Sequence, residues 1–371
     1  MSGLRVHAIE RRRVALPLVT PFRTSFGTQH DRDILLVRVE TGAGEGWGEC
    51  VALTEPVYSA EYVDGAQQVL RDHLAPRVFA AGPLDGAGDL ARVLAPVHGH
   101  PMAKAALELA LLDAELRAVD VTLAARLGGI RERVACGVSI GMFPLPELLD
   151  QVDGYLARGY RRVKLKIEPG FDIEPVRAVR ERHPDLALQV DANTAYTVHD
   201  AARLAALDPF DLLLIEQPLP EDDLLGHAEV ARRVRTPICL DESITSARVA
   251  RQAIELGACS IVNIKAGRVG GYLEAVRVHD VCVARGIPVW CGGMLETGIG
   301  RAANVALAAL PGFTLPGDTS ASDRYYARDV LTTPFTLDGG CLTVPTGPGL
   351  GVTVDVAHVA ELTTHLEVVR P

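Results

Sequence analysis

Short apolar runs alternate with helix-like stretches through the middle of the chain, and this alternation restricts the fold more than any other feature. Eight β-like runs lie between residues 134 and 319: VACGVSI, RVKLKI, LALQVDAN, LLLIEQP, PICLDES, SIVNIK, PVWCGGM and FTLPGDT. Strands joined by helical crossovers run parallel to one another. Eight such units predict an α/β fold with a closed (β/α) barrel. A doubly wound open sheet is the alternative, but no Gly-x-Gly-x-x-Gly turn follows an early run.

The chain on either side of this repeat has a different pattern. Three segments rich in Val, Ile and Leu predict a small antiparallel sheet: residues 4–19, 33–40 and 46–53. Residues 102–118 space their apolar side chains as an amphipathic helix does. We therefore predict three parts: an α+β domain over residues 1–125, a barrel over residues 126–325, and a C-terminal segment over residues 326–371 that packs back on the first domain.

Composition narrows the class of partner and the compartment. The net charge of −10 argues against a nucleic-acid or anionic-membrane partner, because either would favour a basic surface. Seven scattered cysteines with no C-x-x-C pair suit reduced thiols in a cytoplasm. No secretory signal is evident, and no segment approaches the roughly 18 apolar residues that a membrane span needs. We expect a cytoplasmic protein whose partner is a small molecule.

Five charged residues close successive β-like runs at a nearly constant interval. Lys166, Asp191, Glu216, Asp241 and Lys265 are separated by 25, 25, 25 and 24 residues. In a parallel barrel, the strand ends open onto one shared mouth, where catalytic groups lie. The spacing therefore predicts three carboxylates around one point, with a lysine on each side.

Three converging carboxylates repel one another and need a cation if all are to stay ionised. Oxygen ligands suit Mg²⁺ or Mn²⁺ better than Zn²⁺. We expect Asp191, Glu216 and Asp241 to be the ligands. A divalent ion held there would also bind a substrate carboxylate and stabilise the enediolate that forms when the adjacent carbon loses its proton.

The flanking lysines then become the candidate bases. A free lysine titrates near ~10.4, and a nearby dication or second ammonium lowers that value. Lys164 lies on the same strand face as Lys166 and supplies such a charge or binds the substrate carboxylate. Arg268 is positioned to do the same near Lys265, and Asn193 is a candidate hydrogen-bond donor to the substrate.

Each of these residues, taken alone, also has a purely structural interpretation. An acidic residue at a strand end is usually a turn or a helix cap, and Glu242 and Ser243 fit that description. A barrel that binds a metal without catalysis would be expected to lack one of the two lysines. None of the eleven histidines closes a β-like run, which argues against a zinc hydrolase.

Several strings resemble the enolase superfamily, muconate-lactonizing subgroup: KLKIEPG (164–170), DANTAY (191–196), IEQP (215–218), CLDES (239–243) and NIKAGRVGG (263–271). Enolase-superfamily sites use Lys or His bases together with Mg²⁺. Further strings resemble the branch of o-succinylbenzoate synthases and N-succinylamino acid racemases: PFRTSFGTQ (21–29), GWGEC (46–50), WCGGMLETGIGRAANVALAALP (290–311), LPGDTSASDR (315–324) and VPTGPGLGV (344–352).

This resemblance implies a modified TIM barrel, (β/α)₇β, with an α+β capping domain. It implies Lys166 and Lys265 as the acid/base pair, and mobile loops over residues 20–29 and 50–60 that cover the substrate. Further substrate-binding candidates are Phe22, Arg23 and Tyr58 in these loops, and, on the acyl-chain side, Ser139, Gly292, Gly293 and Met294. One departure is Ala266, where many relatives have proline, but no catalytic group is lost there.

The resemblance implies two reactions through one enediolate. In racemisation, one lysine removes the α-proton and the other delivers a proton to the opposite face. In the synthase reaction of menaquinone biosynthesis, one lysine acts as both base and acid in a syn elimination of water. Dipeptide epimerisation and muconate cycloisomerisation are the alternatives within the superfamily. Epimerases typically carry Asp-x-Asp after the last barrel strand, whereas Asp318 is followed by Thr319 and Ser320. The resemblance also implies a homo-oligomer, either a dimer or an octamer.

Overall fold

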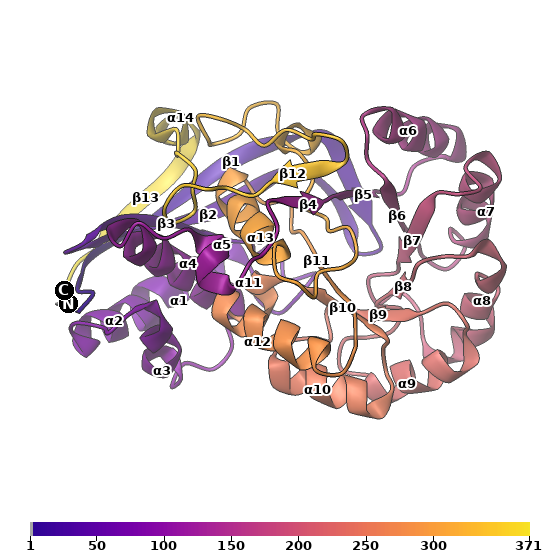
Figure 1. The fold of residues 1–371 in the computed structure, drawn as a ribbon, viewed down its shortest axis with the longest axis horizontal. Helices are drawn as coiled ribbons and strands as arrows, with labels where there is room; N and C mark the ends of the chain where they lie inside the picture. Colours follow the sequence, from indigo (N-terminus) through magenta and orange to yellow (C-terminus); the bar gives the residue numbers. More distant parts are fainter. Residues whose placement is uncertain (1–2) are drawn as a thin grey trace.

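The computed structural model describes residues 3–371 and contains a parallel barrel beside an antiparallel sheet with its own helices (Figure 1). The barrel sheet has seven strands in the order β11-β10-β9-β8-β7-β6-β5, and every adjacent pair in it is parallel. Their bounds are β5 (Gly137–Ile140), β6 (Arg162–Lys166), β7 (Ala187–Asp191), β8 (Ile215–Glu216), β9 (Ile238–Leu240), β10 (Ile261–Ile264) and β11 (Val289–Cys291).

The eighth predicted run closes the ring without forming a regular strand. Its residues make two isolated parallel bridges, Phe313 with Val289 of β11 and Gly317 with Cys136 just before β5. The Gly137 amide donates to the Gly317 carbonyl over 2.7 Å. The eighth run is therefore not a regular strand, and the prediction was wrong on that point. The segment nevertheless occupies the eighth position of a modified TIM barrel. Pro316 has no amide hydrogen to contribute to a ladder.

Helices cover the outside of the barrel, as the alternating pattern predicts (Figure 1). Several have a polar outer face and an apolar inner face, because their apolar side chains recur at helical spacing. Their bounds are α6 (Leu145–Ala157), α7 (Ile173–Arg182), α8 (Ala201–Ala205), α9 (Leu224–Arg233), α10 (Ala247–Leu256), α11 (Ala266–Val269), α12 (Tyr272–Val283) and α13 (Gly298–Ala308).

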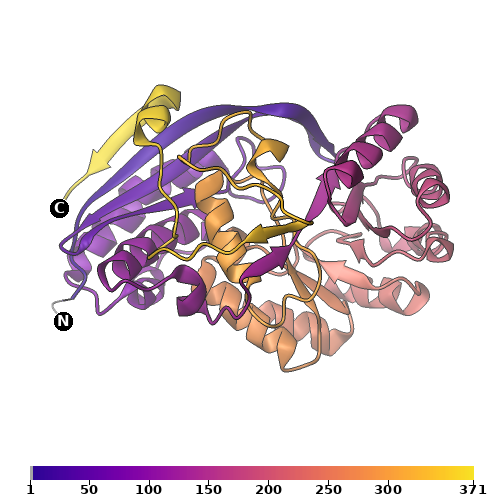
Figure 2. The same ribbon diagram turned by 45° about the horizontal axis from the view of Figure 1, so that its top comes forward.

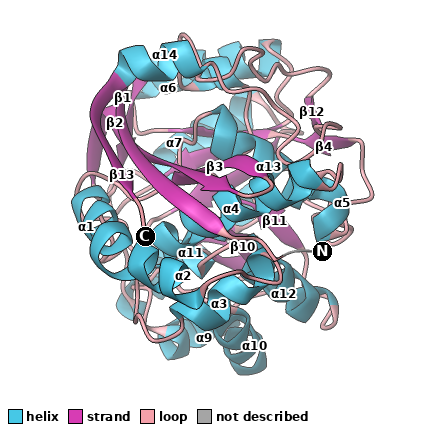
Figure 3. Ribbon diagram, turned by 90° about the vertical axis from the view of Figure 1, so that its left-hand side faces the viewer, coloured by secondary structure: helices cyan, strands magenta, loops and turns pink. Residues whose placement is uncertain are grey.

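The predicted antiparallel sheet is present, and its first two strands are longer than the sequence indicated (Figure 3). Its order is β13-β1-β2-β3, with bounds β1 (Val6–Thr24), β2 (Gly27–Thr41), β3 (Gly44–Cys50) and β13 (Thr363–Val369). The last strand of the chain thus pairs with the first, and both termini lie on the same side of the molecule (Figure 1). A short ladder joins β4 (Arg133–Ala135) to β12 (Cys341–Thr343), and α14 (Val356–Leu362) precedes β13.

Helix α4 (Pro101–Ala118) confirms the helix predicted over 102–118 and packs directly on β3. The close approach depends on glycine, because a Cβ at Gly48 would lie 2.0 Å from the Ala106 carbonyl oxygen. The remaining helices of this sheet domain, here called the cap, are α1 (Val63–Val69), a π-helical turn (Leu70–Leu74), α2 (Ala75–Ala81), α3 (Leu90–Leu94) and α5 (Leu123–Leu127).

The β1–β2 hairpin is long enough to reach from the cap across to the barrel near α6 (Figure 2). Residues 20–29, expected to form a loop, are instead its tip, with Phe22 paired to Gln29 and Thr24 to Gly27. Among residues 3–371, the helices are all too short or too polar to cross a membrane.

Candidate active site

The five residues of the predicted constellation meet at one end of the barrel. Lys166, Asp191 and Glu216 are the last residues of β6, β7 and β8, while Asp241 and Lys265 directly follow β9 and β10. In either direction around the closed ring, three strand positions lie between β6 and β10. The two lysines therefore stand on opposite sides of the mouth, with the carboxylates between them on one arc. All five side chains are buried.

Lys166 is held by the strand end next to its own. Its ammonium donates to Asp191 Oδ2 and to Asn193 Oδ1, both over 2.6 Å. The Asn193 amide group donates in turn to Glu242 Oε1 over 2.9 Å. The Phe22 ring lies over the ammonium, with its centroid 5.8 Å from Nζ. Lys166 thus faces a carboxylate, an amide and an aromatic ring.

Lys265 has a different set of partners. Its ammonium donates to Asp241 Oδ2 over 2.7 Å and to the Tyr58 hydroxyl over 3.2 Å. Arg268 also binds Asp241, and its guanidinium donates to the carbonyls of Ile244 and Asn263. Arg268 therefore braces the carboxylate on which Lys265 rests.

Lys164 lies deeper in the barrel and joins three carboxylates. Its Nζ lies 2.7 Å from Asp318, 2.9 Å from Glu216 and 3.2 Å from Asp191. Asp318 is also held by Arg162 over 2.7 Å. The predicted position of Lys164 beside Lys166 is confirmed, and its charge offsets the carboxylates that end β7 and β8 as well as Asp318 in the eighth run.

The surroundings of Lys166 and Lys265 shift the pKa of the two lysines in opposite directions. Burial lowers the pKa of Lys166 and outweighs the opposing charge of Asp191, while Lys164 lowers it further. Burial also acts to lower the pKa of Lys265, but the surrounding groups Tyr58, Glu242 and Glu216 outweigh it, so that the pKa is raised. The pKa of Lys166 thus shifts in the expected direction, whereas the lowering of the Lys265 pKa by a bound divalent ion stays a prediction.

The three central carboxylates suit a hard divalent cation. Burial and the charge of Asp191 raise the pKa of Glu216, so this carboxylate is short of positive charge. Burial also acts to raise the pKa of Asp191, but the charges of Lys166 and Lys164 outweigh it and lower that pKa. Two of the three carboxylates already share the Lys164 ammonium. Within residues 3–371, no three acidic, histidine or cysteine side chains form a ready-made coordination shell, because ammonium groups lie among the carboxylates. The donor set is oxygen only, which fits Mg²⁺ or Mn²⁺.

The cap supplies side chains to both lysines. Phe22 lies at the tip of the long hairpin, where Arg23 pairs with Glu168 over 3.3 Å and Ser25 donates to the Asn193 carbonyl over 3.0 Å. Tyr58, from the segment after β3, reaches Lys265. Phe22, Arg23 and Tyr58 thus lie at the barrel mouth, and their contact with a substrate stays a prediction.

The residues predicted for the acyl-chain side lie on the arc that closes the ring. Ser139 on β5 is the strand neighbour of Lys164, and its buried hydroxyl has no hydrogen-bond partner among the described residues. Gly292, Gly293 and Met294 follow β11. A Cβ at Gly292 would lie 2.3 Å from the Asn263 side chain, which explains the glycine.

Sequence reasoning missed several residues of the site. Asp318 closes the eighth run and could have been found by the strand-end rule that revealed the other five. Asn263 lies two residues before Lys265 and donates to Glu216 over 2.7 Å. The alternation that linked Lys164 to Lys166 points to it equally. Glu242 was assigned to a turn or cap, but its carboxylate is buried beside Asn193, and burial with the charge of Asp191 raises its pKa to about 7.

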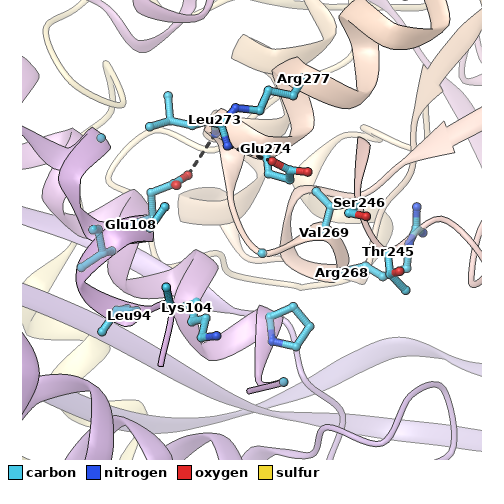
Figure 4. Close-up of a pocket in the computed structure, with 17 residues that line it drawn as sticks. Leu94, Lys104, Glu108, Thr245, Ser246, Arg268, Val269, Leu273, Glu274 and Arg277 are labelled. Carbon is cyan, nitrogen blue, oxygen red and sulfur yellow. Dashed lines mark hydrogen bonds and ion pairs between the residues drawn. The ribbon is translucent and has the colours of Figure 1, made fainter. Parts of the chain in front are cut away.

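A cavity of about 520 Å³ lies elsewhere, between cap and barrel (Figure 4). None of the five strand-end residues lines it. Figure 4 shows Glu108 of α4 pointing to the start of α12, where its carboxylate accepts from the Leu273 amide over 3.1 Å. We interpret this cavity as part of the seam between the two domains.

Comparisons with known proteins agree with this architecture. Residues 8–128 match the family model for the mandelate racemase / muconate lactonizing enzyme N-terminal domain, and residues 147–358 match the enolase C-terminal domain-like model. The chain is similar to an N-succinylamino acid racemase from an Amycolatopsis species, with 65% identity covering 97% of this chain and 98% of the relative.

Two further relatives extend this picture. An o-succinylbenzoate synthase from Geobacillus kaustophilus is 46% identical over 97% of this chain and 96% of its own length. The crystal structure of an enolase-superfamily member from Listeria innocua superposes with a TM-score of 0.94 at 39% identity, covering 99% of both chains. Both the fold and the whole length of this chain are thus shared with these proteins.

Proposed function

The chain is an enzyme of the mandelate racemase / muconate lactonizing enzyme family within the enolase superfamily, and from that premise we propose that it removes the proton next to a substrate carboxylate. We further propose that its reaction is N-succinylamino acid racemisation, o-succinylbenzoate synthesis, or both. One observation carries the proposal: Lys166 and Lys265 stand on opposite sides of the mouth, with Asp191, Glu216 and Asp241 on the arc between them.

In this proposal, Asp191, Glu216 and Asp241 hold a divalent cation, with Mg²⁺ the expected ion and Mn²⁺ a substitute. When bound, such an ion neutralises the substrate carboxylate and thereby acidifies the neighbouring C–H. The protein residues move the proton. Lys166 takes it at Nζ from one face of the substrate, and Lys265 serves the opposite face. Asn193 and Tyr58 orient the two ammonium groups through the hydrogen bonds described above.

The charge balance of the mouth supports an anionic substrate. Five cationic side chains, Arg162, Lys164, Lys166, Lys265 and Arg268, are linked by ion pairs to four of the five surrounding carboxylates, namely Asp191, Glu216, Asp241 and Asp318. Glu242 is the fifth carboxylate. A buried site must stay near neutrality. With all five acids ionised and one lysine neutral so that it can act as the base, a bound dication leaves one positive charge in excess, which the carboxylates of an N-succinylamino acid or of the synthase substrate can balance.

Dipeptide epimerisation is disfavoured by the state of Asp318. This residue is placed where an epimerase would bind the substrate ammonium, but Lys164 and Arg162 already occupy its carboxylate. The second acid of the epimerase pattern is replaced by Ser320, whose carbonyl oxygen accepts from Arg301.

The test is solvent exchange in D₂O. Purified protein with Mg²⁺ is mixed with N-succinyl-L-amino acids, and loss of the α-proton signal is followed by NMR, alongside dehydration of the o-succinylbenzoate precursor. We expect exchange that depends on the metal. Exchange with racemisation supports the racemase, and dehydration supports the synthase. The proposal fails if neither reaction occurs.

A further inference from the structure

Gln217 follows Glu216 directly and occupies an unusual place in the backbone. Its side chain is fully buried, and its φ of 37° lies in the left-handed region, which side-chain-bearing residues rarely adopt. Such a conformation persists only where the surrounding structure holds it in place. The question is which contacts do so.

The side-chain amide of Gln217 uses all of its hydrogen-bonding capacity within two loops. Its Oε1 accepts from the amides of Asp241 over 2.9 Å and Ser243 over 3.2 Å. Its Nε2 donates to the Leu219 carbonyl over 3.1 Å and to the Ser243 hydroxyl over 2.7 Å. A primary amide is suited to this role because it combines an acceptor and two donors in one plane. The side chain therefore fastens the loop after β8 to the loop after β9.

The backbone of the same residue reaches a third loop. Its carbonyl accepts from the Thr194 amide over 2.9 Å, in the loop that follows Asp191, and its amide donates to the Cys239 carbonyl over 2.9 Å. Gln217 thus makes hydrogen bonds within or to the loops after β7, β8 and β9, the three strands at whose ends the central carboxylates lie. Leu219 is held from the other side by His227, whose Nε2 accepts from the Leu219 amide over 3.2 Å.

We infer that Gln217 is a positioning residue that sets the placement of Asp241 relative to Glu216. The inference rests on the proposed function in one respect, since it takes these carboxylates as the ligands of a divalent cation. The Gln217 side chain uses its hydrogen bonds on Leu219, Asp241 and Ser243 and not on any of the three carboxylates. It acts through the Asp241 backbone, and removing its amide leaves the Asp241 and Ser243 N–H groups without their acceptor. The loop after β9 then loses the register that brings its carboxylate toward the other two.

The experiment compares two glutamine-to-methionine variants. Gln217→Met keeps the length of the side chain but removes its hydrogen bonds. Gln189→Met is the matched control, because Gln189 is also buried in the barrel, two residues before Asp191, and its Nε2 has no partner among the described residues. Mg²⁺ affinity is measured by calorimetry on the full chain, without substrate. We expect Gln217→Met to raise the Mg²⁺ Kd by about 10- to 100-fold, the range for loss of a residue that orients metal ligands, and Gln189→Met to change it less than about twofold.

Amide hydrogen exchange provides a readout that needs no metal. Asp241 and Ser243 amides should be protected in the parent protein and exchange faster in Gln217→Met only. The inference is overturned if Gln217→Met leaves Kd and exchange unchanged, or if both variants weaken Mg²⁺ binding equally. Should Gln217→Met not fold, Ser243→Ala removes one partner of the same amide and must weaken Mg²⁺ binding at least about threefold. If the parent protein binds no Mg²⁺, the proposed function fails, and the exchange measurement still decides the role of Gln217.

Discussion

The Lys166 and Lys265 sides of the barrel mouth differ in chemistry and in how the cap is attached. Lys166 contacts Asn193 and lies beneath the tip of a long hairpin. The tip is held to the barrel by the half-exposed Arg23–Glu168 pair, by the Ser25 hydroxyl, which donates to the Asn193 carbonyl, and by the Met142 amide, which donates to the Arg23 carbonyl. Lys265 contacts Tyr58, which follows β3. At the end of β3, the buried Glu49 accepts from the Thr297 and Gly300 amides, both over 2.9 Å, at the start of α13.

The two bases are therefore not interchangeable, and the two cap segments are not attached equally firmly to the barrel. Exposed ion pairs contribute little to stability, whereas a buried carboxylate that accepts several amide hydrogens is costly to remove. We therefore expect the hairpin side to open first when substrate enters.

The largest effect is expected from removing either lysine. Lys166→Ala and Lys265→Ala should each lower racemisation by about 10²- to 10⁴-fold, the usual range for a lost general acid or base. Racemisation in both directions needs a base on one face and an acid on the other. Steady-state polarimetry provides the measurement, with circular dichroism to confirm folding. Full turnover in either folded variant would contradict the two-base arrangement.

A second effect concerns Glu49 and the pH dependence of stability. Burial, together with the charge of Glu296, raises its pKa to about 7, above the ordinary value of 4.5. A raised carboxyl pKa contributes stability below the unfolded value, and this contribution is lost as the pH rises through the folded value. Glu49 should therefore lower the free energy of unfolding by up to about 3 kcal/mol between pH 5 and pH 8.

Urea unfolding at pH 5 and pH 8 measures this contribution. Glu49→Gln should lose less stability than the parent protein over that interval, whereas Glu45→Gln, on the exposed part of the same strand, should behave like the parent. Identical pH dependence in Glu49→Gln and the parent would show that the Glu49 carboxylate does not titrate in this window.

Tyr58→Phe should affect only one side of the mouth. The variant keeps the ring, whose centroid lies 4.6 Å from Lys265 Nζ, but removes the hydroxyl that accepts from it. Loss of one hydrogen bond to a charged group corresponds to about tenfold in rate. We expect deuterium exchange through Lys265 to fall about tenfold while exchange through Lys166 stays within about twofold. Asn193→Ala should give the reverse pattern, and equal effects on both sides would remove the distinction.

The smallest effect is expected from Arg23→Ala. Its ion pair with Glu168 is substantially exposed to solvent, so its loss should cost under about 1 kcal/mol. We expect KM to rise less than about fivefold with kcat unchanged. Substrate-saturation kinetics decide this, and a large fall in kcat would mean that the hairpin tip takes part in the chemistry.

Much of the site could be predicted from sequence because residues at the ends of successive barrel strands recur at a nearly constant interval and meet at the same end of the barrel. Lys166, Asp191, Glu216, Asp241 and Lys265 each end a strand, and parallel strands bring their ends together. The barrel itself was predictable from the alternation of runs and helical stretches. The cap sheet was predicted too, although the hairpin tip was taken for a loop.

Asp318 and Asn263 followed the same regular pattern and could have been found, but the other parts that escaped prediction lack any regular interval. Gln217 binds Asp241 and Ser243 across two loops, and no periodicity marks a buried glutamine as their anchor. Glu49 caps a helix 248 residues away. The prediction of an eighth strand was wrong because this segment forms only two isolated bridges and no regular ladder. Such contacts depend on tertiary packing, which one sequence does not encode in a local pattern.

The central claim is that Lys166 and Lys265 serve opposite faces of one substrate carbon. Its most direct test is α-proton exchange in D₂O, followed by NMR for each enantiomer of an N-succinylamino acid separately, in Lys166→Ala and Lys265→Ala. The account predicts that each variant loses exchange of one enantiomer and retains exchange of the other, with opposite preference. Loss of both enantiomers in one variant and of neither in the other would contradict it, because a single base would then serve both faces.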